Sequence, residues 1–172
     1  MTMDWYTVRA WEQMSYLCPQ SSHDHVREVW NLILGPIFPL VSTDGKSFTV
    51  KTEDDDRDRF PQIAVTNPSG RFGTLPLFKV YCIGSADPDT DMWKVLEDAV
   101  QLDLLEASSL FEGKSRASLF AAIAIGPLVR FYRLEEEDYF CYVDYRDRDA
   151  YNVHQDFDVI VEHLLQIRGA MA

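Results

Sequence analysis

Three apolar segments and one helical segment, in a fixed order, constrain the fold of this chain more than any other feature. The segments 62–66, 75–83 and 118–125 have the length and composition of buried strands. Between the second and the third, apolar residues recur at intervals of three and four from 93 to 104, as on one face of a helix. A helix that separates two strands predicts a crossover connection, which we expect to be right-handed.

The rest of the chain adds elements on both sides of this core. We predict helices over 4–17, 22–34, 92–107 and 156–169, and strands over 47–52, 62–66, 75–83, 118–125, 128–134 and 139–145. In the third helix, Glu97, Asp98 and Asp103 fall away from the apolar stripe. This order predicts an α/β fold of the mixed, α+β kind, in which helices flank a central mixed sheet.

The length of 172 residues is sufficient for one hydrophobic core and too short for two. We therefore expect a single domain over 1–172. It would consist of an N-terminal helical extension (1–20), a core (22–134) and a C-terminal strand and helix (135–172).

The charge of the chain bears on its partners. Sixteen basic residues against 28 acidic ones give a formal charge of −12, which disfavours nucleic acid as a partner without excluding a local basic patch. The three cysteines are too widely spaced for a zinc site and indicate reduced thiols. No apolar run approaches the roughly 18 residues that span a bilayer. With no signal-peptide pattern at the start, we expect an intracellular protein, cytoplasmic or nuclear, with no membrane partner.

Short segments of sequence add to the order of elements. Pro61 to Val65 begins the second strand, 99–102 carries Gln101 on the helix, and 122–126 ends a strand at a glycine turn. Together with the order helix, three strands, helix, strand, these segments resemble the PD-(D/E)XK restriction-endonuclease-like superfamily, and especially its members common in fungal genomes. The resemblance implies a restriction-endonuclease-like core with an added C-terminal strand and helix.

The catalytic positions that the resemblance implies carry other residues. In that family the second strand opens with Pro-Asp, and the third carries an acid, an apolar residue and a lysine. This chain has Gln62 at the first position and Lys79-Val80-Tyr81 at the others. Two carboxylates are needed to hold Mg²⁺, whereas Gln62 offers a neutral carbonyl and Lys79 a positive charge. The sequence therefore predicts no metal site and no cofactor. Mg²⁺ would be expected only if the protein were a divergent nuclease.

Five residues remain candidates for a functional site: Glu28, Gln62, Lys79, Tyr81 and Gln101. Glu28 could be an accessory acid on the second helix, and the plain alternative is a solvated carboxylate paired with a nearby arginine such as Arg27 or Arg9. An amine and a phenol at 79 and 81 could bind a ligand or transfer protons. The plain alternative is a strand with one packed face and one wet face.

The aromatic residues of the first helix suggest a contact surface. Trp5 and Trp11 lie outside the nuclease-like core, so they are candidates for binding a partner or a second copy of the chain.

Three functions follow from these patterns. We favour a pseudoenzyme with a nuclease-like fold that binds another protein or self-associates. The alternative is an enzyme, either a divergent nuclease that holds Mg²⁺ through Glu28, Asp55 or Asp58, or a small non-hydrolytic catalyst in the cleft of Lys79 and Tyr81. The third is an unrelated α+β domain with a ligand pocket.

Overall fold

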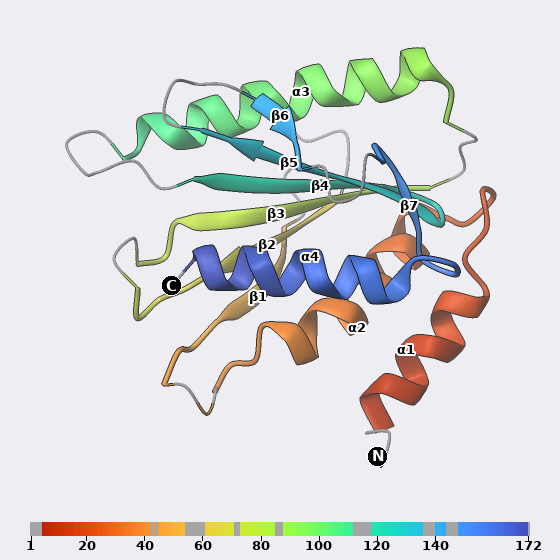
Figure 1. Cartoon of the computed structure of the whole chain (residues 1–172), viewed down its shortest axis with the longest axis horizontal. Coiled ribbons are helices and arrows are strands. Elements are labelled where there is room, and N and C mark those ends of the chain that lie inside the picture. Colours follow the sequence, from red (N-terminus) through yellow and green to blue (C-terminus); the bar gives the residue numbers. More distant parts are fainter. Residues whose placement is uncertain are drawn as a thin grey trace.

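The computed structural model describes residues 5–41, 43, 45–53, 61–70, 73–84, 88–111, 118–135, 140–143 and 148–171, with the backbone alone for 5–7, 141 and 142. Its helices are α1 (Trp5–Ser15), α2 (His23–Ile37), α3 (Thr90–Ser109) and α4 (Phe157–Ala170). Its strands are β1 (Thr49–Glu53), β2 (Gln62–Thr66), β3 (Pro76–Ile83), β4 (Leu119–Ile125), β5 (Leu128–Leu134), β6 (Phe140–Tyr142) and β7 (Tyr151–Asn152). Figure 1 shows these elements arranged around one sheet.

The strands are ordered β1-β2-β3-β4-β5-β6 across the sheet, and β7 pairs with β5. All pairs are antiparallel except β3 and β4, which are parallel because α3 connects them as a crossover. The predicted mixed sheet with flanking helices is confirmed.

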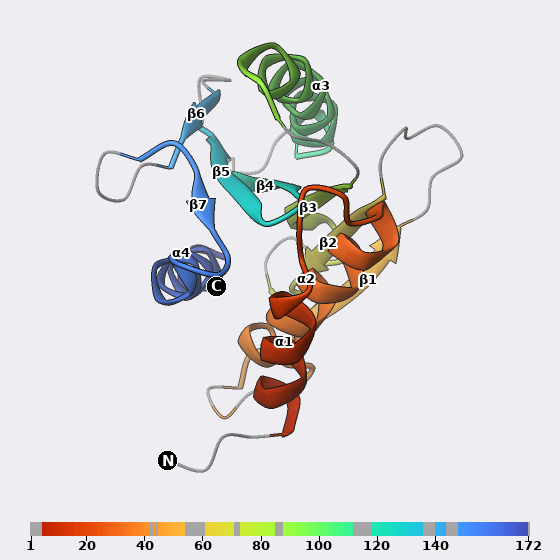
Figure 2. The ribbon, with the colours of Figure 1, turned by 90° about the vertical axis from the view of Figure 1, so that its right-hand side faces the viewer.

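The helices cover both faces of this sheet. α2 contacts β1, β2 and β3 on one face and also packs against α1 and α4, whereas α3 lies on the opposite face against β4 and β5. Figure 2 shows α3 on one side and the other three helices on the other. Each helix buries one stripe of apolar side chains: in α3 these are Trp93, Leu96, Val100 and Leu104, the residues whose spacing predicts the helix.

The link between α1 and α2 is held tightly against the sheet. The backbone N–H of Gly84, just after β3, donates to Nδ1 of His23 at 2.8 Å. Gly126 has a φ of +52°, and a Cβ at this position would lie 3.0 Å from the carbonyl oxygen of Cys18. Gly126 therefore allows the link to approach the sheet closely at Cys18, and Gly84 does so at the α2 N-terminus, which Ser22 caps.

Several element boundaries differ from the sequence-based prediction. α2 continues to Ile37 instead of ending at residue 34, because Ile37 is buried and Pro36 removes one backbone donor only in the last turn. Phe38 then caps the helix by donating to the carbonyl of Leu34 at 2.8 Å. β7 is not predicted from the sequence, since two residues are too short to show a period.

Candidate functional site

Gln62, Lys79 and Tyr81 lie on one face of the sheet. Gln62 pairs with Tyr81 across β2 and β3, and Lys79 is two residues before Tyr81 on the same strand, so all three side chains point to the α3 side. The structure thus brings together the three positions that the resemblance assigns to catalysis. They are closed to solvent: the exposed fractions of Gln62, Lys79 and Tyr81 are 2%, 9% and 7%.

Asp103 of α3 binds two of these side chains. Its Oδ2 lies 2.9 Å from the Lys79 ammonium and accepts the hydrogen bond that the Tyr81 hydroxyl donates. The charge of Lys79 is therefore neutralised within the protein, as a buried charge requires. We call Asp103, Lys79 and Tyr81 the Asp103 cluster.

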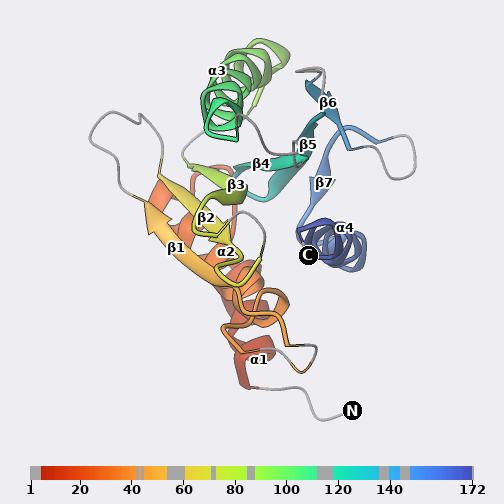
Figure 3. The same ribbon diagram turned by 90° about the vertical axis from the view of Figure 1, so that its left-hand side faces the viewer.

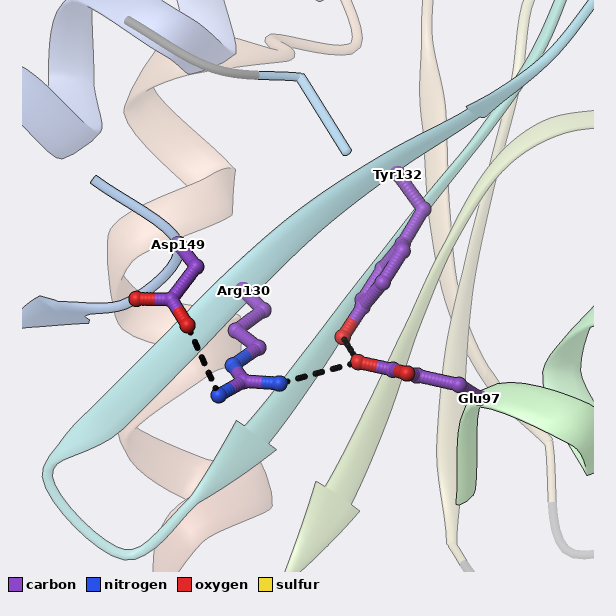
Figure 4. Close-up of polar contacts among 4 residues, drawn as sticks. All are labelled: Glu97, Arg130, Tyr132 and Asp149. Carbon is purple, nitrogen blue, oxygen red and sulfur yellow. Dashed lines mark hydrogen bonds and ion pairs between the residues drawn. The ribbon is translucent and has the colours of Figure 1, made fainter. Parts of the chain in front are cut away.

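A second cluster repeats this arrangement on β5. Oε1 of Glu97 accepts from the Arg130 guanidinium at 2.9 Å and from the Tyr132 hydroxyl at 2.8 Å. Arg130 also contacts Asp149 at 3.1 Å, and its guanidinium carbon lies 4.2 Å from the centre of the Trp93 ring. Figure 4 shows Glu97 between the guanidinium and the phenol. We call Glu97, Arg130 and Tyr132 the Glu97 cluster.

The two clusters have the same chemistry. Each joins one carboxylate of α3 to a cation and a tyrosine two residues apart on a strand. Charge-assisted hydrogen bonds of this kind fix the position of a helix on a sheet. The arrangement therefore attaches α3 to β3 and β5, and it leaves the amine and the phenol of β3 engaged with a carboxylate instead of with a ligand.

The other sequence-predicted candidates lie elsewhere. Gln101 is half-buried on α3. Glu28 is exposed on α2, which packs on the opposite face of the sheet from the Asp103 cluster, and lies 3.9 Å from Arg9. Glu28 is therefore not placed as an accessory acid for Gln62 and Lys79. The alternative ligands Asp55 and Asp58 lie outside the described residues.

The two tryptophans of α1 differ in what can be said of them. The side chain of Trp5 lies outside the described part of the chain. Trp11 is 42% exposed, and its ring centre lies 5.2 Å from that of Phe157 in α4. Trp11 thus links α1 to α4 and leaves part of its ring accessible to a partner.

The described cysteines differ in environment. Cys18 is exposed, whereas Cys82 is buried in β3. Burial raises the pKa of the Cys82 thiol far above its usual range, and the nearby Arg27 guanidinium opposes this only in part. Cys82 is therefore an inert thiol.

In the part of the chain that the structure describes, no three histidine, cysteine, aspartate or glutamate side chains are grouped so that they could hold a metal ion. None of its helices combines the length and the hydrophobicity that crossing a bilayer demands.

The chain was also compared with known proteins. It matches no family model, no curated protein and no solved structure.

The Asp103 and Glu97 clusters were not predicted from the sequence, which places both carboxylates off the apolar stripe of α3. A signal was nevertheless present. Lys79 with Tyr81 and Arg130 with Tyr132 place a cation and a phenol on the same face of two strands of one sheet. Such buried pairs require a carboxylate from the element that covers them.

Proposed function

We propose that this chain is a non-catalytic protein with a nuclease-like fold that acts by binding another protein. The observation that carries the proposal is the engagement of Asp103 with both Lys79 and Tyr81. A metal-dependent nuclease needs at these positions carboxylates that are free to bind Mg²⁺. Here the Gln62 amide and the Lys79 ammonium occupy the carboxylate positions, the Tyr81 phenol occupies the lysine position, and the Asp103 carboxylate holds α3 in place.

The arrangement of elements supports the nuclease-like part of the proposal. The order α2, β1, β2, β3, α3, β4 is the order of helix, three strands, helix and strand on which the resemblance depends. The alternatives, a divergent Mg²⁺-dependent nuclease or a small catalyst at Lys79 and Tyr81, require a carboxylate pair or an accessible amine. The observed cluster favours neither of them.

The surface supports the protein-binding part. The formal charge of −12 opposes a phosphate backbone. Trp11 exposes 42% of its surface, and aromatic side chains of this kind are often central to protein interfaces. Location in the cytoplasm or the nucleus remains a prediction from the sequence.

The experiment that tests this proposal combines two measurements on the full chain. Incubation with DNA and with RNA in Mg²⁺ or Mn²⁺ should give no cleavage, because Gln62 and Lys79 stand where the nuclease family has its carboxylates. Light scattering should show a defined complex with a protein partner, or self-association, that is weakened in Trp11→Ala. Cleavage that disappears in Glu28→Gln would instead establish the nuclease alternative, and a strict monomer without any partner would contradict the binding function.

A further inference from the structure

Strand β1 forms a border of the sheet. It pairs with β2 and with no other strand in the described part of the chain, and Figure 3 shows it as the outermost strand on that side. In an antiparallel pair, alternate residues turn their N–H and C=O groups away from the partner strand. No backbone hydrogen bond from another described residue uses these outward groups over Thr49–Glu53. The border of β1 can therefore accept another strand.

A pocket lies between this strand and helix α2. Its volume is about 390 Å³. Its lining comes from Asp24, Arg27, Glu28, Asn31 and Leu32 of α2 and from Thr52 of β1. The Asn31 side-chain amide donates to the Thr52 hydroxyl at 3.3 Å, which joins the helix to the strand at this point. A helix on one side and a free strand border on the other form the type of groove in which extended peptides bind by strand addition.

The charge of the groove favours one kind of peptide. The side chains of Asp24 and Glu28 are 80% and 54% exposed. Arg27, the basic side chain that lines the groove, already contacts Asp24 at 2.8 Å and is only 21% exposed. Glu28 also has an arginine neighbour, Arg9, at 3.9 Å. Of the charged side chains that line the groove, the two most exposed are nevertheless the carboxylates of Asp24 and Glu28. A second copy of this chain would bring the same carboxylates together, which opposes self-pairing at this border.

We propose that an extended, lysine- or arginine-rich segment of a partner protein adds to the sheet beside β1. Its backbone pairs with the outward N–H and C=O groups of Thr49–Glu53, and its basic side chains contact Asp24 and Glu28. This inference rests on the proposed protein-binding function and specifies the surface and the chemistry of the partner.

The test uses the full chain and a synthetic peptide in which lysine and valine alternate, long enough to pair with all of β1. Fluorescence anisotropy measures the affinity, and NMR-detected amide exchange locates the bound peptide. We expect slower exchange at the outward amides of Thr49–Glu53 and chemical-shift changes along the α2 side of the groove. Methylation of alternate peptide nitrogens on the pairing edge should abolish binding, because it removes the donors that strand addition needs.

A matched pair of variants separates the groove from general charge effects. Asp24→Asn/Glu28→Gln should weaken binding about fivefold, since two exposed ion pairs are lost. Asp98→Asn/Glu106→Gln removes the same charge from exposed positions of α3 and should leave the affinity unchanged. Circular dichroism would confirm that both variants are folded.

The outcomes distinguish this inference from the function on which it rests. Equal weakening by the two variants, or equal binding of the methylated peptide, would show non-specific attraction and overturn the inference. A protein partner that binds while β1 exchange is unchanged would also overturn it, but would leave the protein-binding function intact. Cleavage of nucleic acid would contradict that function whatever the peptide does.

Discussion

At the scale of single residues, the position of Asp103 decides how the candidate site is interpreted. Lys79 and Tyr81 are 9% and 7% exposed, and both contact the same carboxylate oxygen. A buried ammonium without a carboxylate would be costly. Lys79 is thus part of the internal structure of the protein, and its contribution is to stability.

Removal of this carboxylate tests that interpretation. Asp103→Ala should lower the free energy of unfolding by about 2 kcal/mol, because it leaves the Lys79 charge buried and unpaired. We expect a smaller loss of stability than for a fully buried ion pair, because the Asp103 side chain is 30% exposed. Urea denaturation measures it. The double variant Asp103→Ala/Lys79→Met should be more stable than Asp103→Ala, and Asp98→Ala on the exposed face should change stability by less than about 0.5 kcal/mol.

The cysteines give a second prediction at this scale. With iodoacetamide at neutral pH, the folded protein should be modified at Cys18 and not at Cys82, because burial raises the pKa of the Cys82 thiol and blocks access to its sulfur. Peptide mass spectrometry of the treated protein assigns each site, and denatured protein provides the control in which both react. Modification of Cys82 at the rate of Cys18 in the folded state would show that β3 is not packed as described.

At the scale of elements, α3 has two kinds of attachment to the sheet. Its apolar stripe from Trp93 to Leu104 can be predicted from the sequence, because the buried residues recur every three to four positions, as the helix period requires. Glu97 and Asp103 were not identified as contacts. The helical repeat of apolar residues predicts that charged residues outside the stripe face solvent. Glu97 and Asp103 instead lie beside the stripe and form ion pairs with Arg130 of β5 and Lys79 of β3. The elements were therefore predictable, and the polar contacts between them required the tertiary structure.

The contact between β3 and the start of α2 gives a prediction for these elements. In Gly84→Ala, the added Cβ would lie 2.2 Å from the backbone oxygen of Ser21 and 2.4 Å from the nitrogen of His23. Since backbone atoms cannot move aside, we expect a loss of more than about 2 kcal/mol in the free energy of unfolding.

A glycine-to-alanine substitution at an uncrowded position is the control for Gly84→Ala. Gly169→Ala in α4 meets no atom within 4 Å and should leave stability unchanged or raise it by up to about 1 kcal/mol, since alanine is the better helix former. Both values follow from urea denaturation. Equal effects of the two substitutions would contradict the close packing of Gly84 against the α2 cap.

At the scale of the whole molecule, the order of helices and strands determines the sheet. A crossover helix between 75–83 and 118–125 requires a mixed sheet, and the observed β3 and β4 are parallel neighbours. The pairing of β7 with β5 was not predictable, because it depends on two residues. The position of Glu28 relative to Gln62 and Lys79 was also not predictable, since the apolar pattern of α2 does not show which face of the sheet the helix covers.

The central claim is that Lys79 and Tyr81, two of the positions that the resemblance assigns to catalysis, bind Asp103 instead of a divalent ion. The most direct test is the paramagnetic broadening of amide NMR signals by Mn²⁺ in the full chain. We predict no selective broadening at Gln62, Lys79 and Tyr81, because the Lys79 ammonium repels a cation and is already paired with Asp103 at 2.9 Å. Saturable broadening centred on these three residues, at low Mn²⁺ concentration, would show a metal bound there and contradict the account.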